Sequence, residues 1–165
     1  MIAAIVAVDV NFGIGNNGDL LVKLHDDMKR FKELTMNNTV IMGRKTFDSL
    51  STKPLPNRKN IVITNKTSNI HNGIMYMNMD MVQKFLKVKN KEDNIFIIGG
   101  GQIYSQLLPF CDHIYLTKIF KAYDNVDTYF PNIYCIPDWK LKSSSNIYEE
   151  NGIRYRYELY VKNNN

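Results

Sequence analysis

The chain has 165 residues and a mass of 19.2 kDa, which suffices for one domain with a hydrophobic core but not for two. Hydrophobic residues make up 44% and charged residues 22%, so the composition argues against a disordered, collagen-like or coiled-coil chain. The net charge of +5 favours anionic ligands, but it does not choose among phosphates, carboxylates and nucleic acid.

Short apolar runs alternate with helix-like segments along the chain. The alternation predicts an α/β fold with a largely parallel, buried sheet in a single domain over residues 1–162. The apolar runs predict strands at residues 2–10, 39–42, 60–64, 74–76, 94–98 and 113–119. The segments between them predict helices at residues 26–35, 44–49, 81–89 and 101–108.

The last part of the chain has a different pattern. Residues 139–146 and 153–161 alternate between apolar and polar side chains, and they flank the turn-like sequence Glu150-Asn151-Gly152. We therefore expect an antiparallel hairpin to close the sheet. Residues 163–165 are expected to form a frayed carboxyl terminus.

The cysteines and the amino terminus bear on the compartment. Cys111 and Cys135 lie far apart without CxxC spacing, which predicts neither a disulfide framework nor a zinc site, and we expect no metal. Residues 1–10 lack the positive charges that begin a signal peptide, and no apolar stretch reaches the ~20 residues of a membrane span. These features predict a cytoplasmic protein that does not bind a membrane.

A glycine motif follows the first predicted strand. Gly13–Gly18 matches the GxGxxG pattern of dinucleotide-binding Rossmann folds. That fold needs a helix to begin within the glycines, whereas residues 16–18 are poor helix formers and helical periodicity starts near Asp26. Residues 11–23 are therefore predicted to form a flexible loop. It is either a plain surface loop or a mobile loop over a ligand site.

One face of the first predicted helix is apolar apart from a carboxylate. Asp27 on this face points toward the interior, where desolvation would raise its pKa and a polar ligand could pair with it. The alternative is a carboxylate that only complements the helix dipole, a role that Asp26 could equally fill. The face consists of Leu24, Asp27, Met28, Phe31, Leu34 and Thr35.

Three predicted strands end in residues suited to an anion. Gly43 ends one strand, and Arg44-Lys45-Thr46 then opens a helix, which places two cations and free N–H groups together. The next strand ends in Thr64-Asn65-Lys66, and a third in Gly99-Gly100-Gly101, which lets backbone approach a ligand closely. The alternatives are a solvated helix face for the cations and a purely structural turn for the three glycines.

Eight short segments carry a family signal. They are Ile5–Ala7, Gly13–Gly15, Asp27–Lys32, Val40–Thr46, Leu55–Asn60, Ile98–Gly101, Tyr115–Thr117 and Asp127–Pro131. Together, and in this order, they resemble the dihydrofolate reductase family over essentially the whole chain. The resemblance implies one α/β domain with an eight-stranded, mostly parallel, twisted sheet flanked by helices and closed by an antiparallel hairpin.

The resemblance also implies an activity. Members of the family reduce 7,8-dihydrofolate to 5,6,7,8-tetrahydrofolate by hydride transfer from NADPH to C6, which supports one-carbon and thymidylate metabolism and makes them antifolate targets. By resemblance, Asp27 and Thr117 are the catalytic residues. Asp27 would pair with the pterin N3–H and 2-amino groups and promote protonation at N5, and Thr117 would support that pair. A monomer is implied as well.

The resemblance assigns binding residues for substrate and cofactor. For dihydrofolate they are Ile5, Val22, Asp27, Met28, Phe31, Lys32, Leu50, Leu55, Arg58, Ile98, Tyr104 and Thr117. For NADPH they are Ala7, Ile14, Gly15, Asn16, Gly18, Asp19, Leu20, Gly43, Arg44, Lys45, Thr46, Thr64, Asn65, Lys66, Ile98, Gly99, Gly100, Gly101, Gln102, Ile103, Tyr104 and Thr128. A cis peptide between Gly99 and Gly100 is implied too.

The chain departs from the family pattern at a few positions. Leu21-Val22 stands where many members have Pro-Trp, so Val22 offers no indole N–H to order a water near the pterin. Gln102 replaces a cation that some members have near the adenine. The stretch 120–126 has one extra residue, after which Asp127 is expected to steady the loop of residues 11–23 by hydrogen bonding.

Two other functions fit parts of the sequence. One is a related NADPH reductase for another pterin or a pyrimidine substrate, because one fold can serve several substrates. The presence of Asp27 and Arg58 argues against this related reductase, because a substrate without an aminopterin edge and a glutamate tail would need neither residue. The other is a non-catalytic nucleotide-binding module. Binding of nucleic acid is not expected, because the basic residues do not cluster with aromatic ones.

Overall fold

The computed structural model describes residues 1–66 and 68–163. Its helices are α1 (His25–Thr35), α2 (Arg44–Ser49), α3 (Met79–Val88) and α4 (Gly101–Leu107), with the 3₁₀ helices η1 (Leu108–Phe110) and η2 (Ile133–Cys135). The main sheet comprises β1 (Ile2–Val8), β4 (Thr39–Gly43), β5 (Lys59–Ile63), β6 (Asn69–His71), β7 (Ile74–Met77), β8 (Ile95–Gly99), β9 (His113–Ile119), β11 (Trp139–Ser144), β12 (Tyr148–Glu150) and β13 (Ile153–Lys162). A small sheet comprises β2 (Gly13–Asn16), β3 (Asp19–Leu20) and β10 (Thr128–Tyr129).

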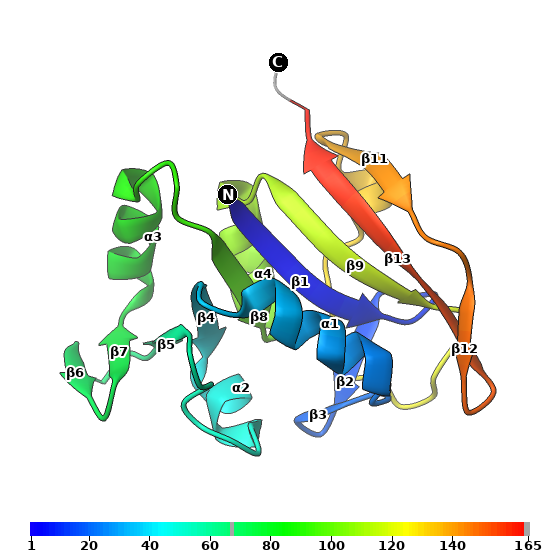
Figure 1. The fold of residues 1–165 in the computed structure, drawn as a ribbon, viewed down its shortest axis with the longest axis horizontal. Coiled ribbons are helices and arrows are strands. Elements are labelled where there is room, and N and C mark those ends of the chain that lie inside the picture. Colours follow the sequence, from blue (N-terminus) through cyan, green and yellow to red (C-terminus); the bar gives the residue numbers. More distant parts are fainter. Residues whose placement is uncertain (67, 164–165) are drawn as a thin grey trace.

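The main sheet runs in the order β11-β13-β9-β1-β8-β4-β5-β7-β6, with β12 paired to β13 outside this path. Its centre is parallel, because β1 pairs in parallel with β8 and β9, and β4 with β5 and β8. The carboxyl-terminal strands pair antiparallel. This arrangement confirms the predicted α/β fold and its closing hairpin (Figure 1).

The predicted count of eight strands was wrong for the main sheet, which has ten strands among the described residues. All eight predicted strands are present, and the two additional ones are β6 and β12. Each of these is short and lies at the surface without a buried side chain, so it produces no apolar run in the sequence. The sequence pattern therefore revealed the strands that carry apolar runs or a clear alternation and missed these two short, exposed ones.

The prediction of a flexible loop implied that segment 11–23 is irregular throughout. In the structure, part of the segment is paired in strands. β2 and β3 form a hairpin within it, and β10 pairs with β2 on the other side. The glycines at its start therefore lie in a strand and not at the beginning of a helix, which excludes the Rossmann interpretation. Gly18 has φ of 80°, which allows the chain to make the tight turn between β2 and β3.

Alternation along the central strands builds a hydrophobic core on each face of the sheet. Ile2, Ala4 and Val6 of β1 belong to the cluster that α3 and α4 cover. Ala3, between them, belongs to a cluster on the opposite face, which includes Phe47 of α2. Figure 1 shows α1 crossing in front of the sheet and α4 behind it. Both faces of the parallel centre are thus covered.

Some features of the described residues concern the surface and the termini. No helix within residues 1–66 and 68–163 is long and apolar enough to cross a membrane. Cys111 is buried and Cys135 exposed, and both are free thiols. In the predicted frayed end, Asn163 donates a backbone hydrogen bond to the carbonyl oxygen of Asp138 at 2.7 Å. Residues 164 and 165 lie outside the described residues.

The packing of α4 predicts a large effect of truncating its buried face. Leu107 is fully buried in the main cluster, so Leu107→Ala should lower the free energy of unfolding by about 2–5 kcal/mol. Val88, at the end of α3, is 78% exposed. Val88→Ala should therefore change the free energy of unfolding by less than about 0.5 kcal/mol. Urea denaturation measures both values. Equal stabilities of the two variants would contradict this packing.

Candidate active site

The carboxyl ends of three central strands lie at one edge of the main sheet. Gly43 of β4 lies opposite Ile63 of the parallel strand β5. On its other side β4 pairs with β8, where Met42 lies opposite Gly99. The strand ends in which the sequence predicted an anion site are therefore neighbours. The residues that follow them are Arg44, Lys45, Thr46, Thr64, Asn65, Lys66, Gly100 and Gly101.

The glycine run after β8 lets backbone and side chains approach closely. Gly99 and Gly100 are joined by a cis peptide bond, as the resemblance implied. Gly99 has φ of 126°, and a Cβ atom there would lie 3.4 Å from Tyr104 Oη and 3.5 Å from Thr46 Oγ1. Tyr104 Oη donates a hydrogen bond to the carbonyl oxygen of Ile5 at 2.7 Å. These contacts bring five predicted site residues together.

The first turn of α4 packs tightly against its surroundings. A Cβ atom at Gly101 would lie 2.8 Å from Thr128 Cγ2, and one at Gly43 would lie 3.0 Å from Ile103 Cγ1. Larger residues would push these neighbours apart. Four predicted cofactor-binding residues thus surround the amino terminus of α4, and that helix has no side-chain cap.

Asp27 lies in the first turn of α1 and points toward the sheet, as its position on the helix predicted. Thr117 Oγ1, on β9, donates a hydrogen bond to Asp27 Oδ1 at 2.5 Å. Burial raises the pKa of Asp27 above its ordinary value. The hydrogen bond from Thr117 and the charge of Arg30 oppose this rise, whereas the charge of Glu150 adds to it. Asp27 therefore takes up a proton more readily than an exposed aspartate.

Two charged groups near Asp27 were not predicted from the sequence, Glu150 and Arg30. The carboxylate of Glu150 accepts hydrogen bonds from the first two backbone N–H groups of α1. The guanidinium of Arg30 lies over the ring of Tyr157, 4.1 Å from its centroid. The sequence does contain a signal that a group such as Glu150 is needed. Leu24 precedes the helix, and its side chain cannot accept a hydrogen bond from the first N–H groups of the helix. Nothing in the sequence indicates which residue supplies the acceptor.

Arg58 lies at the opposite end of α1 from Asp27. Its Nε donates to the carbonyl oxygen of Pro56 at 2.9 Å, and its Nη1 donates to Thr35 Oγ1 at 3.1 Å. Thr35 is the last residue of α1. Among residues 1–66 and 68–163, no carboxylate forms an ion pair with Arg58. The guanidinium therefore retains donors for an anionic ligand.

The predicted apolar contacts of the substrate, and Ala7 on the cofactor side, pack against two different core clusters. Ile5, Leu50, Leu55 and Ile98 are half-buried and pack against one core cluster. Ala7 and Val22 are half-buried against a second cluster, formed by Leu24, Ile119 and Tyr155. Half-buried apolar side chains in an otherwise buried sheet leave surface that a flat apolar ligand can cover.

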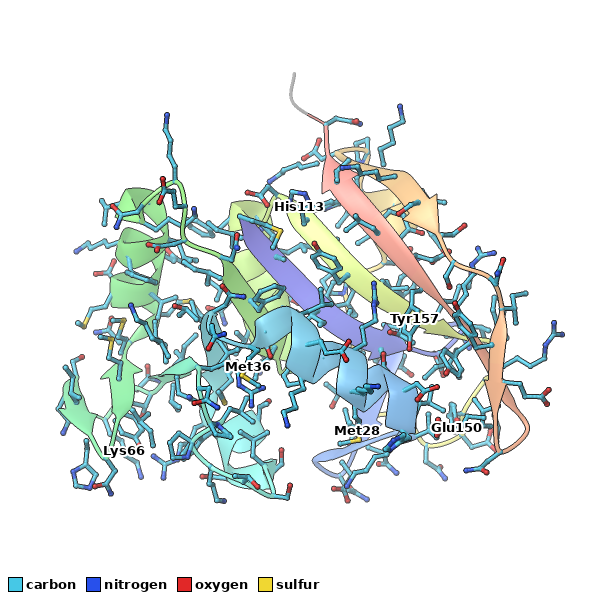
Figure 2. All side chains as sticks on the ribbon, viewed as in Figure 1. Met28, Met36, Lys66, His113, Glu150 and Tyr157 are labelled. Atoms are coloured by element: carbon cyan, nitrogen blue, oxygen red, sulfur yellow. The ribbon has the colours of Figure 1, made fainter. Side chains whose placement is uncertain are left out.

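Three predicted substrate residues on α1 have different environments. Phe31 is half-buried, Met28 is 51% exposed and Lys32 is exposed. Figure 2 shows Met28 below α1, on the side of β3. The structure brings Asp27 into contact with Thr117, but it packs neither Met28 nor Lys32 into the core. On the cofactor side, Gln102 is exposed as well, whereas Ile14 is buried.

The hairpin of β2 and β3 is tied to the segment before β10. The backbone N–H of Asn17 donates to Asp127 Oδ2 at 2.8 Å, which is the hydrogen bond expected between Asp127 and this segment. Gly15 allows the hairpin strands to cross closely, since a Cβ atom there would lie 2.8 Å from the carbonyl oxygen of Asp19. The hairpin also holds the remaining predicted cofactor residues, which are Asn16, Gly18, Asp19 and Leu20.

The amino-acid sequence is similar to those of known proteins over nearly its whole length. The family model of dihydrofolate reductase matches residues 1–162. The chain is 37% identical to the dihydrofolate reductase of Bacillus subtilis strain 168 over 166 aligned positions, which cover 99% of this chain and 96% of that protein. It is 36% identical to the dihydrofolate reductases of Drosophila melanogaster, with 96% of each chain covered, and of Sus scrofa, with 97% of each covered.

The chain therefore belongs to the dihydrofolate reductase family. Membership makes it an enzyme, an oxidoreductase. The family model spans the elements that carry both groups of predicted site residues, from β1 to β13. The resemblance found in the eight sequence segments is thereby confirmed.

The raised pKa of Asp27 predicts how the stability of this protein responds to pH. The folded state binds the Asp27 proton more tightly than the unfolded chain, so ionisation of Asp27 lowers stability as pH rises through its folded-state pKa. Asp27→Asn should therefore increase the free energy of unfolding at neutral pH. The gain should vanish in acid, where Asp27 is protonated.

Denaturant titrations at several pH values measure this difference. Asp26→Asn is the matched control, because Asp26 is exposed in the same helical turn. It should leave the pH dependence of stability near that of the unmodified protein. A stability difference between Asp27→Asn and the unmodified protein that does not change with pH would contradict the assignment.

Proposed function

We propose that this chain reduces 7,8-dihydrofolate to 5,6,7,8-tetrahydrofolate with NADPH as the reductant. Family membership supports dihydrofolate reduction. The observation that carries the proposal is the hydrogen bond between Asp27 and Thr117, which holds a half-buried carboxyl group at the sheet. The aminopterin edge of dihydrofolate offers two N–H donors side by side, and a carboxylate can accept both.

The two ends of α1 suit the two ends of the substrate. Asp27 and Thr35 are eight residues apart, so they lie about 12 Å apart along the helix axis. Arg58 donates to Thr35, and its remaining donors suit the α-carboxylate of the substrate's glutamate. A substrate that reaches from Asp27 to Arg58 would lie along α1, between the pterin and the glutamate contacts. The half-buried Leu50 and Leu55 would pack against its aminobenzoyl ring.

The residues at the sheet edge fit NADPH. Gly99, Gly100 and Gly101 leave room where side chains would otherwise fill the space beside Thr46 and Thr128. The backbone of a glycine run can approach a pyrophosphate closely. Lys45 is an exposed cation beside Thr46, which suits the extra 2′-phosphate of NADPH. The remaining residues proposed for this end are Arg44, Thr64, Asn65 and Lys66.

The reaction adds a hydride to C6 and a proton to N5 of the substrate. NADPH supplies the hydride when it is bound. Asp27 would hold the pterin edge as a carboxylate that accepts from both N–H donors. Since N5 lies beyond its direct reach, Asp27 would promote protonation by polarising the ring and through a water molecule. Thr117 would fix the orientation of the carboxyl group.

Apolar side chains would keep bulk water from the reacting atoms. Ile5 and Ala7 are half-buried on β1, between the strands that lead to the proposed substrate and cofactor residues. Holding two reactants in contact removes much of the entropic barrier to their reaction. Val22 gives the pocket an aliphatic wall where many relatives have an indole, which should change the binding of antifolates that fill the same space.

The direct test measures loss of NADPH absorbance in the presence and absence of dihydrofolate, with NADH and folate assayed in parallel. We expect oxidation that depends on dihydrofolate and prefers NADPH to NADH. Failure of a folded protein that binds NADPH to oxidise it would refute the proposal. It would favour a different pterin or a pyrimidine as the substrate.

The role of Asp27 has its own kinetic signature. Asp27→Asn should lower kcat/KM for dihydrofolate about 10²–10⁴-fold at neutral pH, because positioned acid catalysis contributes on this scale. The loss should shrink in acid, where solvent supplies the proton. Steady-state kinetics from acid to alkaline pH measure this dependence, with Asp26→Asn as the control. An unaltered rate at neutral pH would remove Asp27 from the mechanism.

A further inference from the structure

The amino terminus of α1 lacks a cap from its own segment. Leu24 occupies the capping position, and its side chain cannot accept a hydrogen bond. Leu24 is instead buried against Ile119 and Tyr155, so it anchors the helix to the sheet. The first backbone N–H groups of the helix therefore need an acceptor from elsewhere in the chain.

Glu150, at the end of β12, supplies that acceptor. Its two carboxylate oxygens lie 2.8 and 3.0 Å from the backbone nitrogen of His25, and one lies 3.5 Å from that of Asp26. Figure 2 shows Glu150 beside the end of α1 next to β12. A carboxylate at this end of a helix is also favoured by the helix dipole. Glu150 thus caps a helix that begins 125 residues earlier.

The same part of the sheet holds α1 at a second point. Glu150 lies opposite Ile153 at the start of β13, and further along β13 Tyr157 lies opposite Thr117 of β9. Thr117 binds the Asp27 side chain, while Glu150 binds the helix backbone at His25 and Asp26, within the same turn. The first turn of α1 is therefore attached to one continuous stretch of strands through two polar contacts.

We propose that Glu150 is a positioning residue for Asp27, which fixes the first turn of α1 so that the Asp27 carboxyl group meets Thr117. This proposal deepens the proposed function and rests on it for the catalytic consequence. Glu150 does not itself contact the reacting atoms. It acts through the helix backbone and through its charge.

The charges around Asp27 make this role measurable. Burial is the largest cause of the raised pKa of Asp27, and the negative charge of Glu150 adds to it. The positive charge of Arg30 on α1 lowers this pKa. The tyrosines that face this region, Tyr155 and Tyr157 on β13 and Tyr104 on α4, all have pKa values raised by burial and stay neutral. Removing the charge of Glu150 should therefore lower the pKa of Asp27.

Three variants separate the charge of Glu150 from its hydrogen bonds. Glu150→Gln retains an acceptor and removes the charge, Glu150→Ala removes both, and Glu149→Gln removes an exposed neighbouring carboxylate as the control. The carbon-13 resonance of the Asp27 carboxyl group in the ligand-free protein reports its titration. Thermal unfolding and kcat against pH complete the set.

We expect Glu150→Gln to move the Asp27 titration and the pH profile of kcat to lower pH, with a small effect on Tm. Glu150→Ala should lower Tm by roughly 2–4 °C, as loss of a cap does in a domain of this size, and should also lower kcat. Glu149→Gln should change none of these. If Glu150→Ala fails to fold, Glu150→Gln still decides the outcome through the Asp27 titration.

Two results would overturn the proposal. One is an Asp27 titration and a kcat that stay unchanged in both Glu150 variants, even if Tm falls, because Glu150 would then be a cap without influence on Asp27. The other is an equal shift in Glu149→Gln, which would reflect net charge alone. The titration needs no substrate, so absence of dihydrofolate reductase activity would refute the proposed function and leave this test intact.

Discussion

The proposed site depends on one interaction, the hydrogen bond from Thr117 to the half-buried carboxyl group of Asp27. A carboxyl group without polar partners would be costly at this position, because burial disfavours its charged form. Thr117 satisfies one oxygen by donating a hydrogen bond, and partial burial raises the pKa of the group. The group is therefore held in place yet left ready for a ligand with N–H donors. A purely structural carboxylate would be fully paired within the protein.

Strand β1 connects this group with the glycine run at the sheet edge. β9, which carries Thr117, pairs with one side of β1, and β8, which leads to Gly99, pairs with the other. Neighbouring strands lie about 4.8 Å apart, so β8 and β9 are separated by roughly 10 Å. Tyr104 reinforces the junction by donating to the carbonyl oxygen of Ile5. The sheet spacing thus sets the distance between the proposed substrate and cofactor residues.

The sequence predicted what depends on local periodicity. The helical position of Asp27 indicated its inward direction, and the alternating apolar runs identified the long strands of the main sheet. Short strands such as β6 were missed, because all three of its residues are exposed and form no apolar run. The contact of Glu150 with α1 joins residues 125 positions apart, so no local pattern could reveal it. Family resemblance gave Arg58 a role that its own neighbours in the sequence do not indicate.

The two polar attachments of α1 have opposite electrical effects on Asp27. Thr117 stabilises the ionised carboxylate by donating a hydrogen bond, whereas the negative charge of Glu150 destabilises it. Replacing Glu150 by a neutral cap would preserve the helix but weaken the tendency of Asp27 to retain a proton. Arg30, held over Tyr157, limits how far that tendency can rise. Glu150 therefore affects Asp27 in two ways, because the same side chain caps the helix that carries Asp27 and supplies a negative charge near its carboxyl group.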